Sequence, residues 1–207
     1  MSTPRPDARP EVLLIDCYPD GWKDRVHHFV RTINRSGMVS ITVDYRAARR
    51  DLPLPRFGGA VVTGSPAMLS ERAPRAGLGE LVESLSCPVL GVCFGHQLLG
   101  HMTGVPVHRG EKHERIERVR LRKPHFLFAG LGDGFEMLES HEEFLDRAEA
   151  EGAGWEVLAE SDSCPVEAMA RRDRPWYGVQ FHPERSKEAG DVLVENFVRS
   201  LAAAGNG

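Results

Sequence analysis

The stretch "PVLGVCFGHQLLG", residues 88–100, places Cys93 between two glycines at the end of a short apolar run. The apolar residues before the cysteine are typical of a β-strand, and the residues from Gly95 onward are typical of a helix. Glycines two positions on either side, Gly91 and Gly95, indicate a backbone turn so sharp that side chains there would clash. The pattern G-x-C-x-G is therefore the thiol counterpart of the G-x-S-x-G nucleophile elbow.

A cysteine in such a turn would present its sulfur at the carboxyl edge of the sheet, where ligands bind in open α/β folds. The amides at the start of the next helix favour a thiolate there. A free thiol with a pKa of about 8.5 is little ionised at neutral pH, so a nucleophile at this position needs a partner base. The alternative is that Cys93 is a small core residue between strand and helix.

A candidate partner base lies in "YGVQFHPE", residues 177–184, where His182 ends an apolar run. Glu184 follows two positions later, and residues i and i+2 of an extended chain point to the same side. We therefore expect the carboxylate to accept the imidazole N–H, which orients the ring and stabilises its protonated form. Taken alone, the tripeptide is equally typical of an exposed His and Glu at a strand end.

The order of the elements predicts the fold class. Between residues 11 and 104, apolar runs and helical stretches follow the order β-α-β-β-α-β-α. Because these strands are apolar throughout, they indicate a mainly parallel sheet covered by helices on both faces. The first helix is predicted over residues 22–37, with Asp20 as its cap and Gly37 at its end.

After residue 104 the segments become short and partly alternating, which predicts additional antiparallel strands, residues 105–110, 115–122 and 175–181 among them. The last segment, residues 189–205, is an amphipathic helix whose apolar side consists of Val192, Val194, Phe197, Val198 and Leu201. The predicted class is α/β: a mainly parallel sheet with helices on both faces and extra antiparallel strands in the C-terminal half.

Length and composition predict a single domain over residues 11–204, preceded by a disordered tail over residues 1–10. The chain has 207 residues, of which 41% are hydrophobic, and its net charge of -4 gives no reason to expect a nucleic-acid partner. No apolar run is long enough to span a membrane. The four cysteines are irregularly spaced, so we expect neither disulfides nor a metal site, and a cytoplasmic location.

The motifs together resemble those of the class I glutamine amidotransferases. "LGVCFGHQLL" and "GVQFHPE" are similar to the nucleophile elbow and the triad segment of that family, "GGAVVTGSP" to its oxyanion segment, and "ESHEEFLD" to its glutamine-binding segment. The resemblance runs from about residue 11 to residue 200 and implies a flavodoxin-like fold. It extends to the glutaminase part of GMP synthase and to stand-alone members that act as γ-glutamyl peptidases.

The resemblance also implies a role for each matching residue. Cys93 would attack the side-chain carbonyl of glutamine, His182 would transfer the proton, and Glu184 would hold His182. The backbone amides of Ser65 and Phe94 would bind the oxyanion. The substrate would be held by Gly64, Gln97, Ser140, His141 and Glu142. The reaction implied needs no metal and no cofactor.

Some positions depart from the family pattern. Ser65 stands where many members have glycine, and Glu143 replaces an aspartate. Cys17, in the loop after the first strand, is expected to be an ordinary packed residue. The sequence contains no G-x-x-x-x-G-K phosphate loop, which leaves the fate of the ammonia open.

The sequence is compatible with three functions. The leading one is a glutaminase that hydrolyses glutamine through a cysteine thioester and passes ammonia to a separate acceptor, a synthetase subunit. The second is a stand-alone hydrolase of γ-glutamyl peptides or amides. The third is a non-catalytic regulatory module that keeps the fold.

Overall fold

A computed structural model describes residues 11–52 and 57–204, and in this part of the chain one mixed sheet forms the centre of the fold. Its nine strands follow the order β2-β1-β3-β4-β9-β8-β7-β5-β6. The first five pair in parallel. They are β2 (Val39–Asp44), β1 (Glu11–Asp16), β3 (Gly59–Val62), β4 (Val89–Val92) and β9 (Trp176–Val179).

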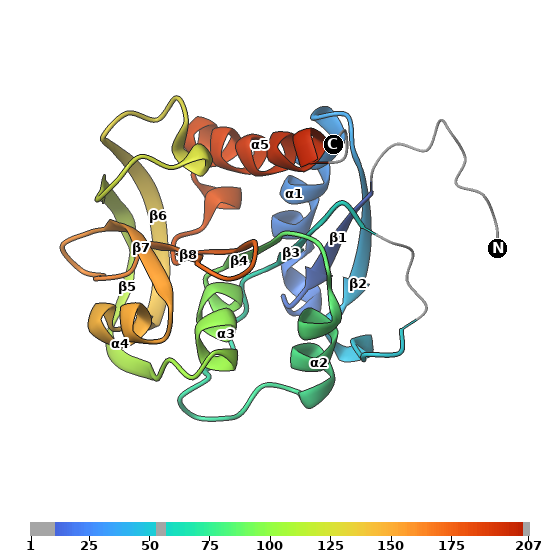
Figure 1. The fold of residues 1–207 in the computed structure, drawn as a ribbon, viewed down its shortest axis with the longest axis horizontal. Helices are drawn as coiled ribbons and strands as arrows, with labels where there is room; N and C mark the ends of the chain where they lie inside the picture. The colour runs from blue at the N-terminus through green and yellow to red at the C-terminus, as the bar shows by residue number, and fades with distance from the viewer. Residues whose placement is uncertain (1–10, 53–56, 205–207) are drawn as a thin grey trace.

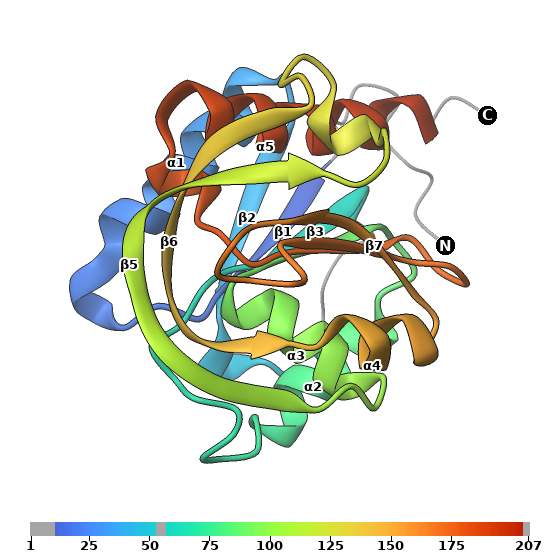
Figure 2. The same ribbon diagram turned by 90° about the vertical axis from the view of Figure 1, so that its left-hand side faces the viewer.

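The other four strands extend the sheet in antiparallel fashion. They are β8 (Ala168–Arg171), β7 (Trp155–Glu160), β5 (Val107–Leu121) and β6 (Gly134–Leu145). Figure 2 shows β5 and β6 as two long strands that curve together around one side of the molecule. The predicted fold class is thereby confirmed.

Helices cover both faces of the sheet (Figure 1). On one face lie α1 (Lys23–Arg35) and α5 (Lys187–Ala204); on the other lie α2 (Ala76–Ser84), α3 (Phe94–Met102) and the short α4 (Arg147–Gly152). Strand β1 shows how the sequence divides the core, since Val12 and Leu14 join the cluster beneath α1 and α5. Its alternate residues, Leu13 and Ile15, join the cluster of α2 and α3.

Two strand predictions need correction. The last segment, expected among the added antiparallel strands, becomes β9, which pairs in parallel with β4 and antiparallel with β8. The segments 105–110 and 115–122, expected as two strands, belong largely to one continuous strand, β5, whose pairing with β6 is irregular between Arg109 and His113. Helix α4 was not predicted; Asp146 caps it by accepting from the amides of Ala148 and Glu149.

The predicted cap of α1 is also wrong. Asp20 begins a short 3₁₀ turn, Asp20–Trp22, and its carboxylate accepts a hydrogen bond from Arg46 at 2.7 Å instead of capping the helix. Gly37 has a φ of 87° and ends α1 as expected. In α5, Leu193 rather than Val192 is fully buried, and the other four predicted apolar residues are buried.

The predicted disordered tail, residues 1–10, lies outside the described residues. Among the helices of residues 11–52 and 57–204, none combines the length and apolarity that crossing a lipid bilayer requires.

Candidate active site

Cys93 occupies the turn between β4 and α3, with φ of 50° and ψ of -103°. A left-handed φ is strained for any residue other than glycine, and the close packing around the turn maintains it. A Cβ atom on Gly91 would lie 2.5 Å from the backbone of Gly95, and one on Gly95 would lie 2.3 Å from the carbonyl oxygen of Val62. The two glycines thus permit the sharp elbow that the sequence predicted.

His182 and Glu184 meet just beyond the end of β9. Nδ1 of His182 lies 2.7 Å from Oε1 of Glu184, and both side chains are buried. The contact predicted from the sequence is present, but the geometric reason given for it is wrong. Pro183–Arg185 is a 3₁₀ turn rather than an extended segment, and this turn brings the carboxylate back to the ring.

Electrostatics favour an ionised pair. Burial lowers the pKa of His182, but the negative charges of Glu184 and Cys93, with hydrogen bonds to both, raise it well above its usual value. Burial raises the pKa of Glu184, yet the charge of His182 and hydrogen bonds from His182 and Tyr18 hold it below its usual value. The imidazole is therefore kept protonated beside a carboxylate.

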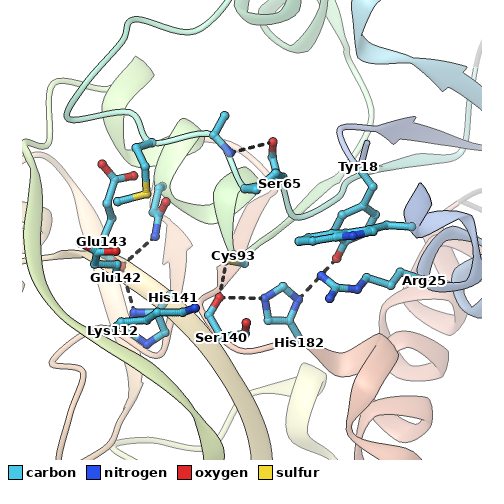
Figure 3. A pocket seen from close by; sticks show the side chains of 15 residues that line it. Tyr18, Arg25, Ser65, Cys93, Lys112, Ser140, His141, Glu142, Glu143 and His182 are labelled. Atoms are coloured by element: carbon cyan, nitrogen blue, oxygen red, sulfur yellow. Dashed lines mark hydrogen bonds between the residues drawn. The ribbon is translucent and has the colours of Figure 1, made fainter. Parts of the chain in front are cut away.

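Cys93 and His182 converge on one backbone oxygen (Figure 3). The carbonyl oxygen of Ser140, in β6, lies 3.9 Å from Sγ of Cys93 and 3.4 Å from Nε2 of His182. The side-chain amide of Gln180 donates to the same sulfur at 3.7 Å. The sulfur, the imidazole and the carboxylate, which lie far apart in sequence, are thus brought to one place.

The candidate oxyanion donors lie beside this group. Phe94 is the first residue of α3, so its amide has no acceptor one turn earlier in the helix. Ser65 follows β3, and its hydroxyl accepts from the amide of Ala67 at 3.2 Å. Gly64 must be small, because a Cβ there would lie 2.8 Å from the Tyr18 hydroxyl and 3.0 Å from Cε1 of His182.

One cavity of about 300 Å³ adjoins the cysteine. Seven of the predicted site residues line it: Ser65, Cys93, Gln97, Ser140, His141, Glu142 and His182. The other three contact or adjoin these in the chain: Gly64, Phe94 and Glu184. The structure therefore brings the whole predicted set together, on the loops after β3, β4 and β9 and on β6.

Not every predicted substrate-binding side chain is free to bind. The amide nitrogen of Gln97 donates to the carbonyl of Glu143 at 2.8 Å and to Oε1 of Gln180 at 3.1 Å. The carboxylate of Glu142 accepts from Nε of Arg109 at 2.5 Å, and Nδ1 of His141 lies 3.0 Å from the Glu143 carbonyl. These bonds position the segment that forms this side of the cavity.

Three residues at the site were missed as functional. Tyr18 donates to Oε1 of Glu184 at 2.5 Å, and Gln180 contacts Cys93. The Glu143 carboxylate accepts the amides of Leu69 and Ser70 at 2.9 and 2.6 Å, which ties the loop after β3 to β6. Tyr18 follows the end of β1, and Gln180 lies within the motif that contains His182 and Glu184. Their positions at the carboxyl edge of the sheet could therefore have identified them as site residues.

Cys17 is packed in the core as expected, and burial raises the pKa of its thiol. Within residues 11–52 and 57–204, no three His, Cys, Asp or Glu side chains are grouped so that they could hold a metal ion.

The family described as "Glutamine amidotransferase class-I" matches residues 13–201 of the chain. Over 176 residues the chain is 32% identical to a glutamine-hydrolyzing GMP synthase subunit of Pyrococcus abyssi, and the match covers 84% of this chain and 92% of that protein. It is also 32% identical over 177 residues to the protein of the same name from Methanocaldococcus jannaschii, covering 84% and 90%.

Solved structures share the fold. A protein from Thermoplasma acidophilum described as a putative GMP synthase subunit superimposes with a TM-score of 0.82 at 21% identity, covering 96% of both chains. A glutamine amidotransferase from Thermotoga maritima gives 0.67 at 17% identity, covering 96% of this chain and 86% of that one.

Proposed function

The chain belongs to the class I glutamine amidotransferases and is a glutamine-hydrolysing enzyme, and on this premise we propose that it releases ammonia through a thioester on Cys93 and passes it to a separate acceptor subunit. The observation that carries this proposal is the convergence of Cys93, His182 and Glu184 at one cavity.

In the first half of the reaction, Sγ of Cys93 attacks the side-chain carbonyl carbon of glutamine, and a C–S bond forms. The oxyanion accepts hydrogen bonds from the amides of Ser65 and Phe94, and each such donor contributes ~2.7–4 kcal/mol to the transition state. His182 carries the thiol proton and delivers it to the leaving nitrogen as the C–N bond breaks. Glu184 holds the ring in the orientation for this transfer.

In the second half, water attacks the thioester carbonyl with His182 as the base. The C–O bond forms, the C–S bond breaks, and the proton returns to the sulfur. The products are glutamate and ammonia. The contact between His182 and Glu184 supports this role, because the carboxylate stabilises the charge on the imidazole before substrate binds, against the opposing effect of burial.

The acceptor subunit is proposed from the relatives. The proteins of Pyrococcus abyssi and Methanocaldococcus jannaschii are each named as one subunit of a glutamine-hydrolyzing GMP synthase, and they are similar to this chain over most of their own length. This supports a synthetase as the partner that takes up the ammonia.

The test is incubation of the purified chain with glutamine, alone and with candidate synthetase subunits, while glutamate and ammonia are measured. The proposal expects glutamate in both cases and faster release with the correct partner. Turnover that is the same in a Cys93→Ala variant would exclude the thioester mechanism, and wild-type protein that releases no glutamate with any partner would favour a regulatory module.

A further inference from the structure

The outer edge of β6 is covered by the turn that carries His182. β6 is the last strand in the order of the sheet, so this edge faces no neighbouring strand among the described residues. The backbone amide of His182 donates to the carbonyl of Leu138 at 2.9 Å, and Nε2 of its ring lies 3.4 Å from the carbonyl oxygen of Ser140. Because residues i and i+2 of a strand present their backbone groups to the same side, His182 contacts this edge with both its main chain and its side chain.

Ser186 completes this pairing with its side chain. Its hydroxyl accepts the amide N–H of Leu138 at 2.9 Å and donates to the carbonyl of His182 at 2.7 Å. In a regular antiparallel pair this N–H and this C=O would bond to each other directly, and here one hydroxyl links them. The amide of His182 and the hydroxyl of Ser186 together satisfy both backbone groups that Leu138 presents at the edge.

The backbone of Ser186 is itself held by the turn and the start of α5. Its amide donates to the carbonyl of Pro183 at 3.1 Å, and its carbonyl accepts the amide of Gly190 at 3.3 Å. Gly190 must be small, because a Cβ atom there would overlap the carbonyl oxygen of Pro183. Lys187, the first residue of α5, has a left-handed φ of 50°. The hydroxyl of Ser186 therefore extends from a closely packed backbone.

β6 is the strand that His182 and Cys93 both contact (Figure 3). The carbonyl oxygen of Ser140 that faces the imidazole also lies 3.9 Å from Sγ of Cys93. Glu184 orients the ring, but it belongs to the same turn as His182, so their contact does not by itself set the distance from the ring to the sulfur. Bonds to other elements must set this distance, and the bonds to Leu138 are the ones that involve the backbone of His182.

We propose that Ser186 is a positioning residue for glutamine hydrolysis, whose hydroxyl holds His182 against β6 so that the ring faces the sulfur of Cys93. This inference rests on the proposed role of His182 in the thioester mechanism. Ser186 is not among the described residues that line the cavity, so it should act on proton transfer and not on glutamine binding. A misplacement of about 1 Å in a catalytic group slows a reaction by as much as about a hundredfold.

Three variants test the role of the hydroxyl. Ser186→Ala removes it, and Ser186→Thr keeps it. Ser200→Ala is the matched control, because Ser200 is also half-buried and its hydroxyl donates to the carbonyl of Phe197 at 2.6 Å, within α5. In glutamine hydrolysis, Ser186→Ala should lower kcat at least about tenfold and change KM less than about twofold. Ser186→Thr should retain kcat within about threefold of the wild type, and Ser200→Ala should not change it.

Alkylation of Cys93 by iodoacetamide, followed by mass spectrometry, is a second readout that needs no glutamine. Because His182 activates the sulfur, Ser186→Ala should slow alkylation about tenfold, whereas the other two variants should react like the wild type. Amide hydrogen exchange locates the change, since Leu138 should exchange faster in Ser186→Ala alone. If Ser186→Ala does not fold, Ser186→Cys takes its place with the same expected results, because a thiol fills the space but is a weak donor and acceptor.

A wild-type kcat in Ser186→Ala, a loss that Ser186→Thr does not restore, or an equal loss in Ser200→Ala would overturn the inference. A lower kcat with alkylation of Cys93 at the wild-type rate, or with unchanged exchange at Leu138, would overturn it as well, because the hydroxyl would then not act through His182. Failure of the proposed function is recognised separately, by glutamine turnover that persists in Cys93→Ala.

Discussion

The hydroxyl of Tyr18 lies 2.5 Å from Oε1 of Glu184, the same oxygen that Nδ1 of His182 approaches at 2.7 Å. Tyr18 follows β1, whereas the other two residues follow β9, so the contact joins loops from two strands of the parallel sheet. Because the phenol donates to the carboxylate, it stabilises the charged form of Glu184 and, through it, the protonated ring. Tyr18 is therefore a positioning residue for the triad.

Tyr18→Phe removes this hydrogen bond while keeping the ring. Hydrogen bonds to charged groups contribute ~1.5–3 kcal/mol, so kcat/KM for glutamine should fall roughly ten- to a hundredfold. Thermal unfolding of the variant checks that the fold is retained. A kcat/KM equal to that of the wild type would show that Tyr18 does not act through Glu184.

Glu184→Gln removes the charge that raises the pKa of His182. The pKa of the ring should fall, so the alkaline limb of the kcat/KM profile should move to lower pH, and activity at neutral pH should drop by ~10³–10⁴. Glu188→Gln is the matched control, since Glu188 is exposed on α5. An unshifted alkaline limb would contradict the assignment of Glu184 as the partner of His182.

A second titrating group lies behind the site. Glu139 and Glu167 are fully buried, and Oε2 of Glu139 lies 3.3 Å from Nε2 of His141. Burial raises the pKa of Glu139 from 4.5 to about 8, and burial and the charge of Glu139 raise that of Glu167 well above its usual value. A negative charge on Glu139 therefore opposes ionisation of Glu167.

Because the pKa of Glu139 is higher in the folded state than in the unfolded state, its contribution is fully present below pH 4.5 and is lost as the pH rises through about 8. The free energy of unfolding should therefore decline over this range by a few kcal/mol, at about 1.4 kcal/mol for each pKa unit. Glu139→Gln should flatten the decline in urea unfolding measured from pH 5 to pH 9. Glu136→Gln, on the same strand and exposed, should leave it unchanged; equal slopes for all three proteins would contradict the raised pKa of Glu139.

The close packing around the turn at Cys93 leads to a prediction about the free energy of unfolding. Gly95→Ala would place a methyl group 2.3 Å from the carbonyl oxygen of Val62, so the free energy of unfolding should fall by ~1–3 kcal/mol. Gly79→Ala is the control, because it lies in α2 with open space around its Cβ position, where alanine favours the helix. Chemical denaturation measures the free energy of unfolding of both variants. A Gly95→Ala protein as stable as the wild type would mean that the turn tolerates a side chain.

The sequence motifs correctly predicted those features of the site that depend on short-range backbone geometry. The two glycines around Cys93 indicated the elbow, and the motif ending in Glu184 indicated the partner of His182. The same reasoning failed where tertiary pairing decides the outcome. Nothing in residues 176–179 distinguishes a strand that pairs in parallel with β4 from one that pairs in antiparallel fashion, because both are apolar and short.

The long-range contacts at the site could not be predicted from the sequence either. Tyr18 is typical of a turn residue after a strand, and its contact with Glu184 spans 166 positions. Glu143 was noted only as a departure from the family pattern, yet its longer side chain reaches the amides of Leu69 and Ser70. Such contacts depend on how the loops of separate strands meet at the carboxyl edge of the sheet.

The most direct test of the thioester mechanism is to trap the acyl-enzyme. The enzyme turning over isotopically labelled glutamine is quenched in acid, digested and mapped by mass spectrometry. The thioester mechanism predicts a labelled glutamyl thioester on the peptide that contains Cys93, and no label on Cys17, Cys87 or Cys164, which are buried away from the cavity. Glutamate production with no label on Cys93 at any quench time, together with undiminished turnover by Cys93→Ala, would contradict it.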